Sequence, residues 1–366
     1  MYKSSFNRKS YHIFLGVQIL LIVILGTFMF VKSKYDVPAF LFWPIFLSVI
    51  FFGFYGIKNF SSRNKIILIL IILVLSISTI KLLGYPEIYQ MPGQDDYYEV
   101  GYASTLIDNE YWDINAGHGR AENYYGAFPG IHLLLSSSSI ISGLDIFLFS
   151  KYFYWPFLLV MYVLLSYILF SKLLNENKDK YYLSALATLF YMSTIGIMII
   201  HISRRTFADL FALVILYCLI NILTEENGKK MQYSILLIIS LMMVSISHHF
   251  TSYIVLFIFT CIFILFFKSN FRENLNRILL SFVFIFTWIL YVALFVLEKD
   301  IIGAINVFST TLFKNTDVSA VVMTNYNFIE QFLPYISQAI FLSLALIGLI
   351  YIIKRKNILE VGKLKL

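Results

Sequence analysis

The chain has 366 residues, of which 59% are hydrophobic and only 13% are charged, and its mean hydropathy is +0.79. This composition excludes an ordinary soluble domain, and apolar runs of about 20 residues are typical of transmembrane helices. Strand-like alternation is absent, so we expect an all-α polytopic membrane protein. The net charge of +7 lies in short clusters between apolar runs, where basic residues orient helices and do not indicate nucleic-acid binding.

The apolar runs predict about ten transmembrane helices. The short basic segment 1–10 leads directly into the first run and predicts an uncleaved signal-anchor. Both cysteines, Cys218 and Cys261, lie within apolar runs and are interpreted as small buried hydrophobic residues. The predicted spans are 12–31, 38–57, 65–83, 152–171, 182–200, 207–223, 231–247, 250–267, 278–297 and 333–353.

A further segment, 127–148, is long enough to cross a membrane but contains the serine run Ser136–Ser139 and Asp145. The basic residues decide its placement, because Lys and Arg accumulate in cytoplasmic loops. If the segment does not cross, 19 of the 28 basic residues lie inside, and if it crosses, only 11 do. We therefore predict a juxtamembrane or re-entrant helix at the outer surface, with both termini cytoplasmic. The abundance of Ile, Lys, Asn, Tyr and Phe indicates a prokaryotic cell membrane.

This topology places an acidic, tyrosine-rich segment, 94–120, at the outer face of the membrane. Its adjacent carboxylates, Asp95 and Asp96, have the chemistry of a general base or of oxygen ligands for a divalent cation. They permit a metal such as Mg²⁺ or Mn²⁺ but do not require one. A solvated acidic loop is the alternative interpretation of the same residues.

A compact titratable cluster follows at His118, Arg120 and Glu122, between glycines that allow close backbone approach. The planar guanidinium of Arg120 is suited to gripping a phosphate group. A flexible surface turn is the alternative. The sequence alone leaves both interpretations open.

Basic residues also stand at the predicted outer end of the span 207–223, where the charge bias does not favour them. Arg205 and Asp209 are spaced i,i+4 and are expected to pair on one helix face. Charges at a membrane boundary are costly and are usually paired or functional. A phosphate on a lipid carrier would hold Arg204 and Arg205 there, and a structural Arg–Asp pair is the alternative.

Two adjacent histidines, His248 and His249, occupy a tight turn between predicted spans. An imidazole at such a position serves as an acid or base, a metal ligand or a hydrogen-bond donor to phosphate. A purely structural role is the alternative. The loop 298–332 is predicted on the same outer side, so polar groups from distant parts of the chain could meet at one face.

The acidic motif Gln94–Tyr98 is followed by the proline-containing element Phe128–His132, by Gly143–Phe147 and by the Arg-to-Asp element Ser203–Asp209. This order resembles the GT-C superfamily of integral membrane glycosyltransferases, which includes protein mannosyltransferases and arabinosyltransferase-like enzymes. The stretch Ser247–Tyr253 is similar to a Ser-His…Thr element of uncharacterised archaeal members. The resemblance implies a GT-C-like fold.

The resemblance covers roughly residues 65–260. It implies a core at 65–267 that carries the outer acidic loop 84–151. Before the core stands an N-terminal two-span extension, 1–64, and after it come the C-terminal spans and basic tail of 268–366.

The implied activity is transfer of a sugar, a hexose or a pentose, from a polyprenyl-phosphate-linked donor to a glycan or protein acceptor at the extracytoplasmic face. The resemblance makes Asp95 or Asp96 the general base. The donor phosphate would be bound by Arg120, Arg204, Arg205 and His248. Supporting roles fall to Glu99, His118, Glu122, Asp209 and His249.

Two other classes of function stay open. A transporter or flippase of a lipid-linked or anionic solute would place charged or broken helices near the middle of the bilayer, and the predicted spans are largely uncharged there. A non-catalytic membrane assembly subunit would tolerate replacement of the clustered carboxylates.

Overall fold

The computed structural model describes residues 8–32, 39–60, 62–83, 91, 94–112, 126–174, 179–199, 202–224, 230–265, 271–294, 296, 298 and 301–302. The described residues are almost entirely helical and contain no strand. The predicted all-α class is therefore confirmed.

Nine long helices among the described residues each overlap a predicted span. The tenth predicted span, 333–353, lies outside the described residues. The helices are α1 (Arg8–Lys32), α2 (Ala39–Asn59), α3 (Arg63–Leu83), α8 (Trp155–Leu173), α9 (Lys180–Ile199), α10 (Arg204–Thr224), α11 (Lys230–Ser245), α12 (His249–Leu265) and α13 (Phe271–Tyr291).

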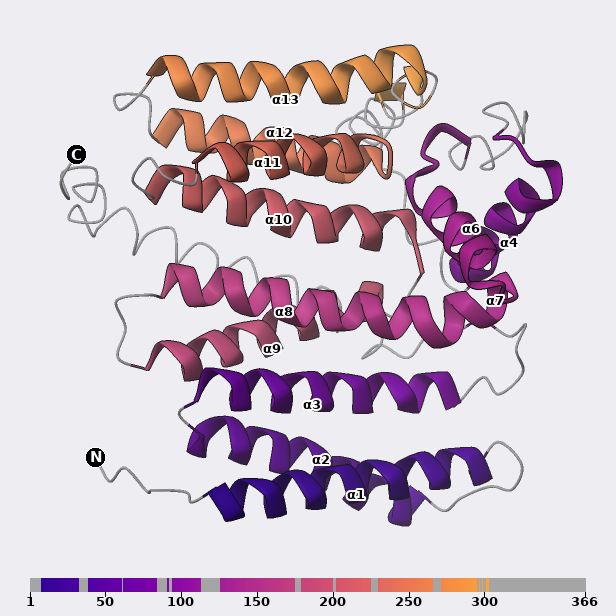
Figure 1. The fold of residues 1–366 in the computed structure, drawn as a ribbon, viewed down its shortest axis with the longest axis vertical. Coiled ribbons are helices and arrows are strands. Elements are labelled where there is room, and N and C mark those ends of the chain that lie inside the picture. The colour runs from indigo at the N-terminus through magenta and orange to yellow at the C-terminus, as the bar shows by residue number, and fades with distance from the viewer. Residues whose placement is uncertain are drawn as a thin grey trace, which may run out of the picture. The chain divides into compact units, whose positions relative to one another are not determined.

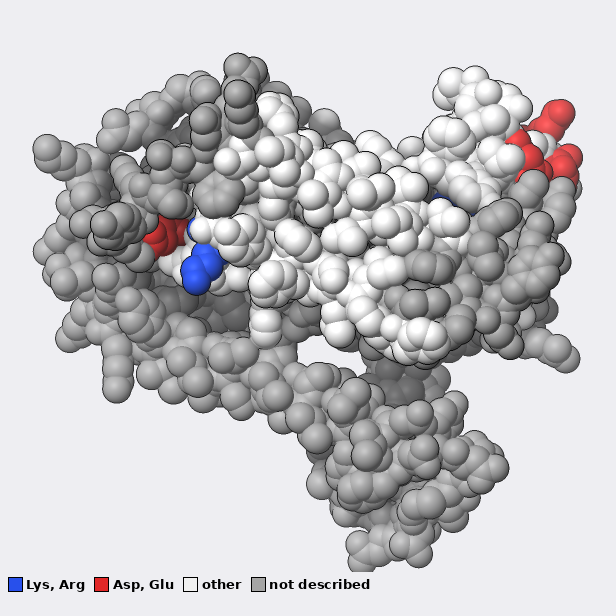
Figure 2. Space-filling model, turned by 90° about the horizontal axis from the view of Figure 1, so that it is seen from below, with Lys and Arg blue, Asp and Glu red and all other residues white. Residues whose placement is uncertain are grey.

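Three helical segments of the described chain are long and apolar enough to cross a membrane: Ser10–Thr27, Ile146–Leu173 and Arg204–Ile222. On the face drawn in Figure 2, most of the charged side chains lie in two groups at opposite sides, and the described surface between them is largely uncharged. An uncharged band between polar margins is the pattern that a bilayer requires.

The chain divides into two compact units, one of residues 1–258 and 281–293 and the other of residues 259–280 and 294–366. In the first unit, α8 packs against α3, α9 and α10, and α1 and α2 pack on each other and on α3 (Figure 1). The predicted N-terminal extension therefore shares a unit with the predicted core. Large aromatic side chains fill the packing around α8, namely Trp155, Tyr162 and Tyr167.

The outer segment predicted as an acidic loop between spans, 84–151, contains a helix that was not predicted, α4 (Gln94–Asn109). The carboxylates of its first turns favour a helix start, because the amino end of a helix carries partial positive charge. It ends beside Glu110, whose backbone is left-handed with φ 61°. Figure 1 shows α4 grouped with two other short helices, and it packs against both.

These two helices, α6 (Gly130–Ser142) and α7 (Ile146–Phe149), replace the single helix predicted at 127–148. Gly143 ends α6 with φ 68°, and the Asp145 carboxylate starts α7 by accepting hydrogen bonds from two backbone N–H groups. The thirteen residues of α6 span about 20 Å, which is less than the roughly 30 Å of a bilayer core. Helix α7 continues into α8.

The start of α6 makes a close backbone contact with the turn between α11 and α12. The Gly130 N–H donates to the Ile246 carbonyl oxygen at 3.0 Å. A Cβ atom on Gly130 would lie 2.3 Å from the Ser247 hydroxyl oxygen and 3.3 Å from Ile246 O. Only glycine fits this position without displacement, so this contact fixes where the polar helices meet the bundle.

We expect Gly130→Ala to lower the free energy of unfolding by about 1–3 kcal/mol, because the added methyl group overfills the contact. Thermal unfolding of the purified protein measures the effect. Gly101→Ala on α4 is the matched control, since a Cβ there meets no atom within 4 Å. The double variant G130A/S247A should recover part of the loss, and equal midpoints for G130A and G101A would contradict the interpretation.

Candidate functional site

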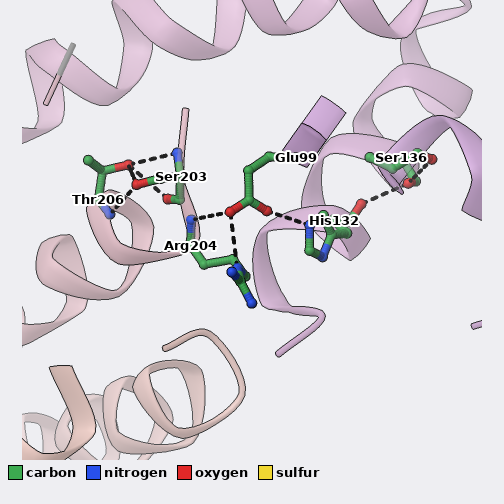
Figure 3. Close-up of polar contacts among 7 residues, drawn as sticks. Glu99, His132, Ser136, Ser203, Arg204 and Thr206 are labelled. Carbon is green, nitrogen blue, oxygen red and sulfur yellow. Dashed lines mark hydrogen bonds and ion pairs between the residues drawn. The ribbon is translucent and has the colours of Figure 1, made fainter. Parts of the chain in front are cut away.

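The Glu99 carboxylate is the centre of the first polar cluster, and it joins three helices (Figure 3). One of its oxygens, Oε2, lies 2.5 Å from His132 Nε2 of α6. The other, Oε1, accepts from Nε of Arg204 at 3.0 Å and from the Arg204 backbone N–H at 3.2 Å, both at the start of α10. Residues far apart in sequence, from three helices, therefore meet at one carboxylate.

Glu99 is ionised in this arrangement. Burial by itself would raise the pKa of the Glu99 carboxyl group, because an apolar environment disfavours charge. The attraction of Arg204 and the hydrogen bonds from His132 and the Arg204 backbone outweigh burial and hold that pKa below its ordinary value. The buried charge of Glu99 is therefore compensated by its partners. Removing one member of the cluster would leave a buried charge without compensation, which is strongly destabilising.

Local hydrogen bonds stabilise the first turn of α10, which carries Arg204. The Ser203 hydroxyl accepts from the Thr206 backbone N–H at 3.2 Å, and the Thr206 hydroxyl donates to the Ser203 carbonyl at 2.8 Å. Such side-chain caps satisfy donors that a helix start leaves open. Tyr162 of α8 donates to the Thr206 carbonyl at 2.5 Å, which ties this turn to the core.

An aromatic ring packs against the His132 side of the cluster. The Trp112 ring stacks on the His132 ring with centroids 5.3 Å apart and an interplanar angle of 19°. The Trp112 indole N–H donates to the Gly126 carbonyl at 2.8 Å. The Ser136 hydroxyl of α6 donates to the Ala103 carbonyl oxygen of α4 at 2.8 Å. Together with the Glu99–His132 pair, this gives α4 and α6 two polar contacts.

A second cluster lies one residue further along α10. Arg205 Nε and Asp209 Oδ2 are 3.7 Å apart, so the predicted i,i+4 pair is confirmed. The Thr251 hydroxyl of α12 donates to Asp209 Oδ1 at 2.8 Å. His248 Nδ1 lies 3.1 Å from the Thr251 hydroxyl oxygen and accepts from the Thr251 backbone N–H at 3.3 Å.

His248 is a neutral imidazole. Burial lowers the pKa of His248 far below its ordinary value, and His249, Arg204 and Arg205 lower it further because a second positive charge is unfavourable beside them. The His248 and His249 rings are themselves neighbours, with centroids 5.0 Å apart. His249 also packs against Phe128, just before α6.

The predicted site residues are distributed unevenly between these clusters. Arg204 belongs to the Glu99 cluster, whereas Arg205, Asp209 and His248 form the second one. Of the predicted general bases, Asp96 is fully buried on α4, and the side chain of Asp95 lies outside the described residues. His118, Arg120 and Glu122 lie entirely outside the described residues.

Sequence reasoning missed several residues of these clusters. His132 stood inside the proline-containing motif without a role, although a buried histidine opposite an acidic helix is a signal for a pair. Thr251 was likewise part of a quoted motif. The π-helical turn η1 (Ser150–Tyr154) had no signal, because an extra residue in a helix leaves no local mark in the sequence.

That turn carries buried polar groups, one of which, Tyr154, interacts with Glu99. Tyr154 is within electrostatic reach of the Glu99 carboxylate, and its hydroxyl has no hydrogen-bond partner among the described residues. The hydroxyl of Ser150 is in the same situation, and the Lys151 side chain is buried as well. A π-helical turn that gathers such groups is a frequent feature of functional sites.

We expect Glu99→Gln to lower the free energy of unfolding by about 3–5 kcal/mol, because the Arg204 charge would lose its buried counter-ion. Asp108→Asn, on an exposed position of the same helix, is the control and should change stability by less than about 0.5 kcal/mol. Tryptophan fluorescence during thermal unfolding measures both, since Trp112 stacks on His132. Equal midpoints for the two variants would contradict a central role for Glu99.

The low pKa of His248 predicts a pH-dependent stability. Below about pH 6.5, an unfolded His248 takes up a proton that the folded protein does not accept, so stability falls as pH falls, by at most about 1.4 kcal/mol per pH unit. His248→Asn removes this dependence and keeps a side chain that caps helices well. Unfolding midpoints of both proteins between about pH 5 and 7.5 test this. If the midpoints of the two proteins changed with pH by the same amount, the prediction would be refuted.

No three His, Cys, Asp or Glu side chains within the described ranges are grouped so as to hold a metal ion. Since the Asp95 side chain lies outside those ranges, a metal at Asp95 and Asp96 stays a prediction. No protein-family model, curated protein or solved structure matches this chain.

Proposed function

We propose that the chain is a polytopic membrane protein of about ten spans, with α4, α6 and the start of α10 at the extracytoplasmic face. Three apolar helices that are long enough to cross, and the overlap of nine helices with predicted spans, support this topology. The length of α6 supports a helix that does not cross. In the proposed topology, the turn Ile246–His249 also lies on the outer side, because Gly130 contacts it.

We propose that the protein is a glycosyltransferase that moves a sugar from a polyprenyl-phosphate donor to a glycan or protein acceptor. The observation that carries the proposal is the contact of Glu99 with Arg204, which brings the acidic helix α4 to the basic start of α10. A transfer site needs both a carboxylate base for the acceptor and cations for the phosphate that departs. These two elements adjoin here.

The proposed reaction is a single displacement. The acceptor hydroxyl oxygen bonds to the anomeric carbon of the sugar while the bond from that carbon to the phosphate oxygen breaks. The acceptor proton passes to a carboxylate, and the phosphate leaves with the bonding electrons. Asp95 is our first choice as base, because Asp96 is enclosed by protein. Fixed cations stabilise the negative charge that grows on the phosphate in the transition state.

The contacts divide the two arginines between roles. Arg204 is held by Glu99 through both its side chain and its backbone, so we assign it to the joint between α4 and α10. The Arg205 side chain is 39% exposed and its distance to Asp209 is 3.7 Å, which leaves it the more available cation. We therefore assign Arg205, with His248, to the donor phosphate.

A non-catalytic assembly subunit is the second candidate. The observation that favours it is the mutual compensation of Glu99, His132 and Arg204, which would stabilise a membrane bundle without any reaction. The two candidates differ in what Asp95 does. A carboxylate that acts as a base is needed for turnover, whereas a carboxylate in a structural subunit is replaceable.

We expect the purified protein, reconstituted in vesicles, to transfer radiolabelled sugar from a polyprenyl-phosphate donor to an acceptor supplied on the extracytoplasmic side. Asp95→Asn should reduce the rate at least about 100-fold, because a general base contributes roughly 10²–10⁴-fold. Asp108→Asn again serves as the control for a neutralised carboxylate on the same helix. Unchanged transfer by both D95N and D96N would overturn the base assignment. Complete absence of transfer and donor hydrolysis would favour the assembly subunit.

A further inference from the structure

Asp209 connects two helices at the second cluster. Its Oδ1 oxygen accepts the hydroxyl hydrogen of Thr251, 42 residues later on α12, while its Oδ2 oxygen lies 3.7 Å from Arg205 Nε. The carboxylate thus holds a residue of α12 with one oxygen and attracts the Arg205 guanidinium with the other. We name Asp209 and Thr251 together the α10–α12 clamp.

The clamp also borders the ring of His248, and the contacts there decide which ring nitrogen carries the proton. The Thr251 backbone N–H points at His248 Nδ1, and its hydrogen is fixed by the peptide plane. The hydroxyl hydrogen of Thr251 rotates freely and is drawn to the Asp209 carboxylate. Nδ1 therefore presents a lone pair, and the neutral ring carries its proton on Nε2.

Two hydrogen-bond donors consequently border the clamp, Arg205 next to Asp209 and His248 next to Thr251. The Arg205 guanidinium has donors only, in a planar fork that matches phosphate oxygens. The Nε2–H group of His248 is a further donor, and it bonds to no described residue. Arg204 and Arg205 both act electrostatically on His248, and their charges are balanced in part by Glu99 and Asp209. Such a set of groups favours a phosphate oxygen over a neutral ligand.

We propose that Arg205 and the Nε2–H group of His248 form one phosphate-binding site, and that Asp209 and Thr251 are positioning residues that hold these two donors at a fixed spacing. The proposal rests on the proposed function, in which the phosphate belongs to a polyprenyl lipid. Asp209 and Thr251 act through Arg205 and His248 and need not touch the ligand. Without the Thr251 hydroxyl, Asp209 loses its hold on α12 and the two donors separate.

The test measures equilibrium binding of undecaprenyl phosphate to the full-length protein in nanodiscs. Undecaprenol, which lacks the phosphate, and inorganic phosphate are separate arms that distinguish a lipid phosphate from free phosphate. Thr251→Val removes the hydroxyl with little change of shape, and Thr251→Ser restores it. Thr105→Val is the matched control, because the Thr105 hydroxyl bonds only a carbonyl of its own helix, Gly101 O. Arg205→Gln changes a partly exposed donor and so reports independently of core packing.

We expect T251V and R205Q each to weaken binding of undecaprenyl phosphate about tenfold or more, which is the scale of one lost hydrogen bond to a charged group. T251S should bind within about twofold of the unchanged protein, and T105V should match it, because neither loses the clamp. Undecaprenol should bind weakly to every variant. Stronger competition by inorganic phosphate than by the lipid would support the site but contradict the lipid as its source.

Three results would overturn the proposal. The first is a folded T251V protein that binds as tightly as T105V, and the second is an unchanged affinity in R205Q. The third is an unaltered protein that does not distinguish undecaprenyl phosphate from undecaprenol. Sugar transfer is measured on the same samples. Its absence alongside clamp-dependent binding overturns the glycosyltransferase proposal and leaves the phosphate site standing.

Discussion

An ionised carboxylate enclosed by apolar helices needs hydrogen-bond donors and a counter-ion, and this requirement determines how the polar parts of the chain are arranged. Glu99 is buried and ionised, with His132 on one oxygen and Arg204 on the other. Neither partner is close in sequence, so satisfying the charge forces α4, α6 and α10 together. The stacking of Trp112 and the contact of Gly130 with Ile246 follow from, and reinforce, that convergence.

The positions of the long helices could be predicted because each is an apolar run, and a membrane leaves such runs few alternatives. The pairing of Arg205 with Asp209 was predictable for a similar reason, since residues four apart on a helix are neighbours. The identity of the central carboxylate was not predictable. Local patterns drew attention to the doublet Asp95–Asp96, whereas the contacts that single out Glu99 come from 33 and 105 residues away.

Two features of the fold were not predicted, for separate physical reasons. Helix α4 is polar on average, so a search for apolar runs does not find it, although its acidic first turn is a helix signal. The break inside 127–148 did leave marks, namely Gly143 after α6 and Asp145 before α7. Both are ordinary stop and start residues, and length alone had suggested one continuous helix. Thr251 was part of a recognised motif. Its pairing with Asp209 was not predictable, because it depends on how α12 packs beside α10.

The π-helical turn at Ser150–Tyr154 has a consequence for how α8 is oriented. The turn accommodates one more residue than a regular α-helical turn would, and each residue of an α-helix advances by about 100°. Every side chain of α8 is therefore set about one position further round the axis than a continuous helix from α7 would place it. Loss of a single residue here would act as a rotation of the whole helix, turning Tyr162 away from the start of α10 without altering any contacting residue.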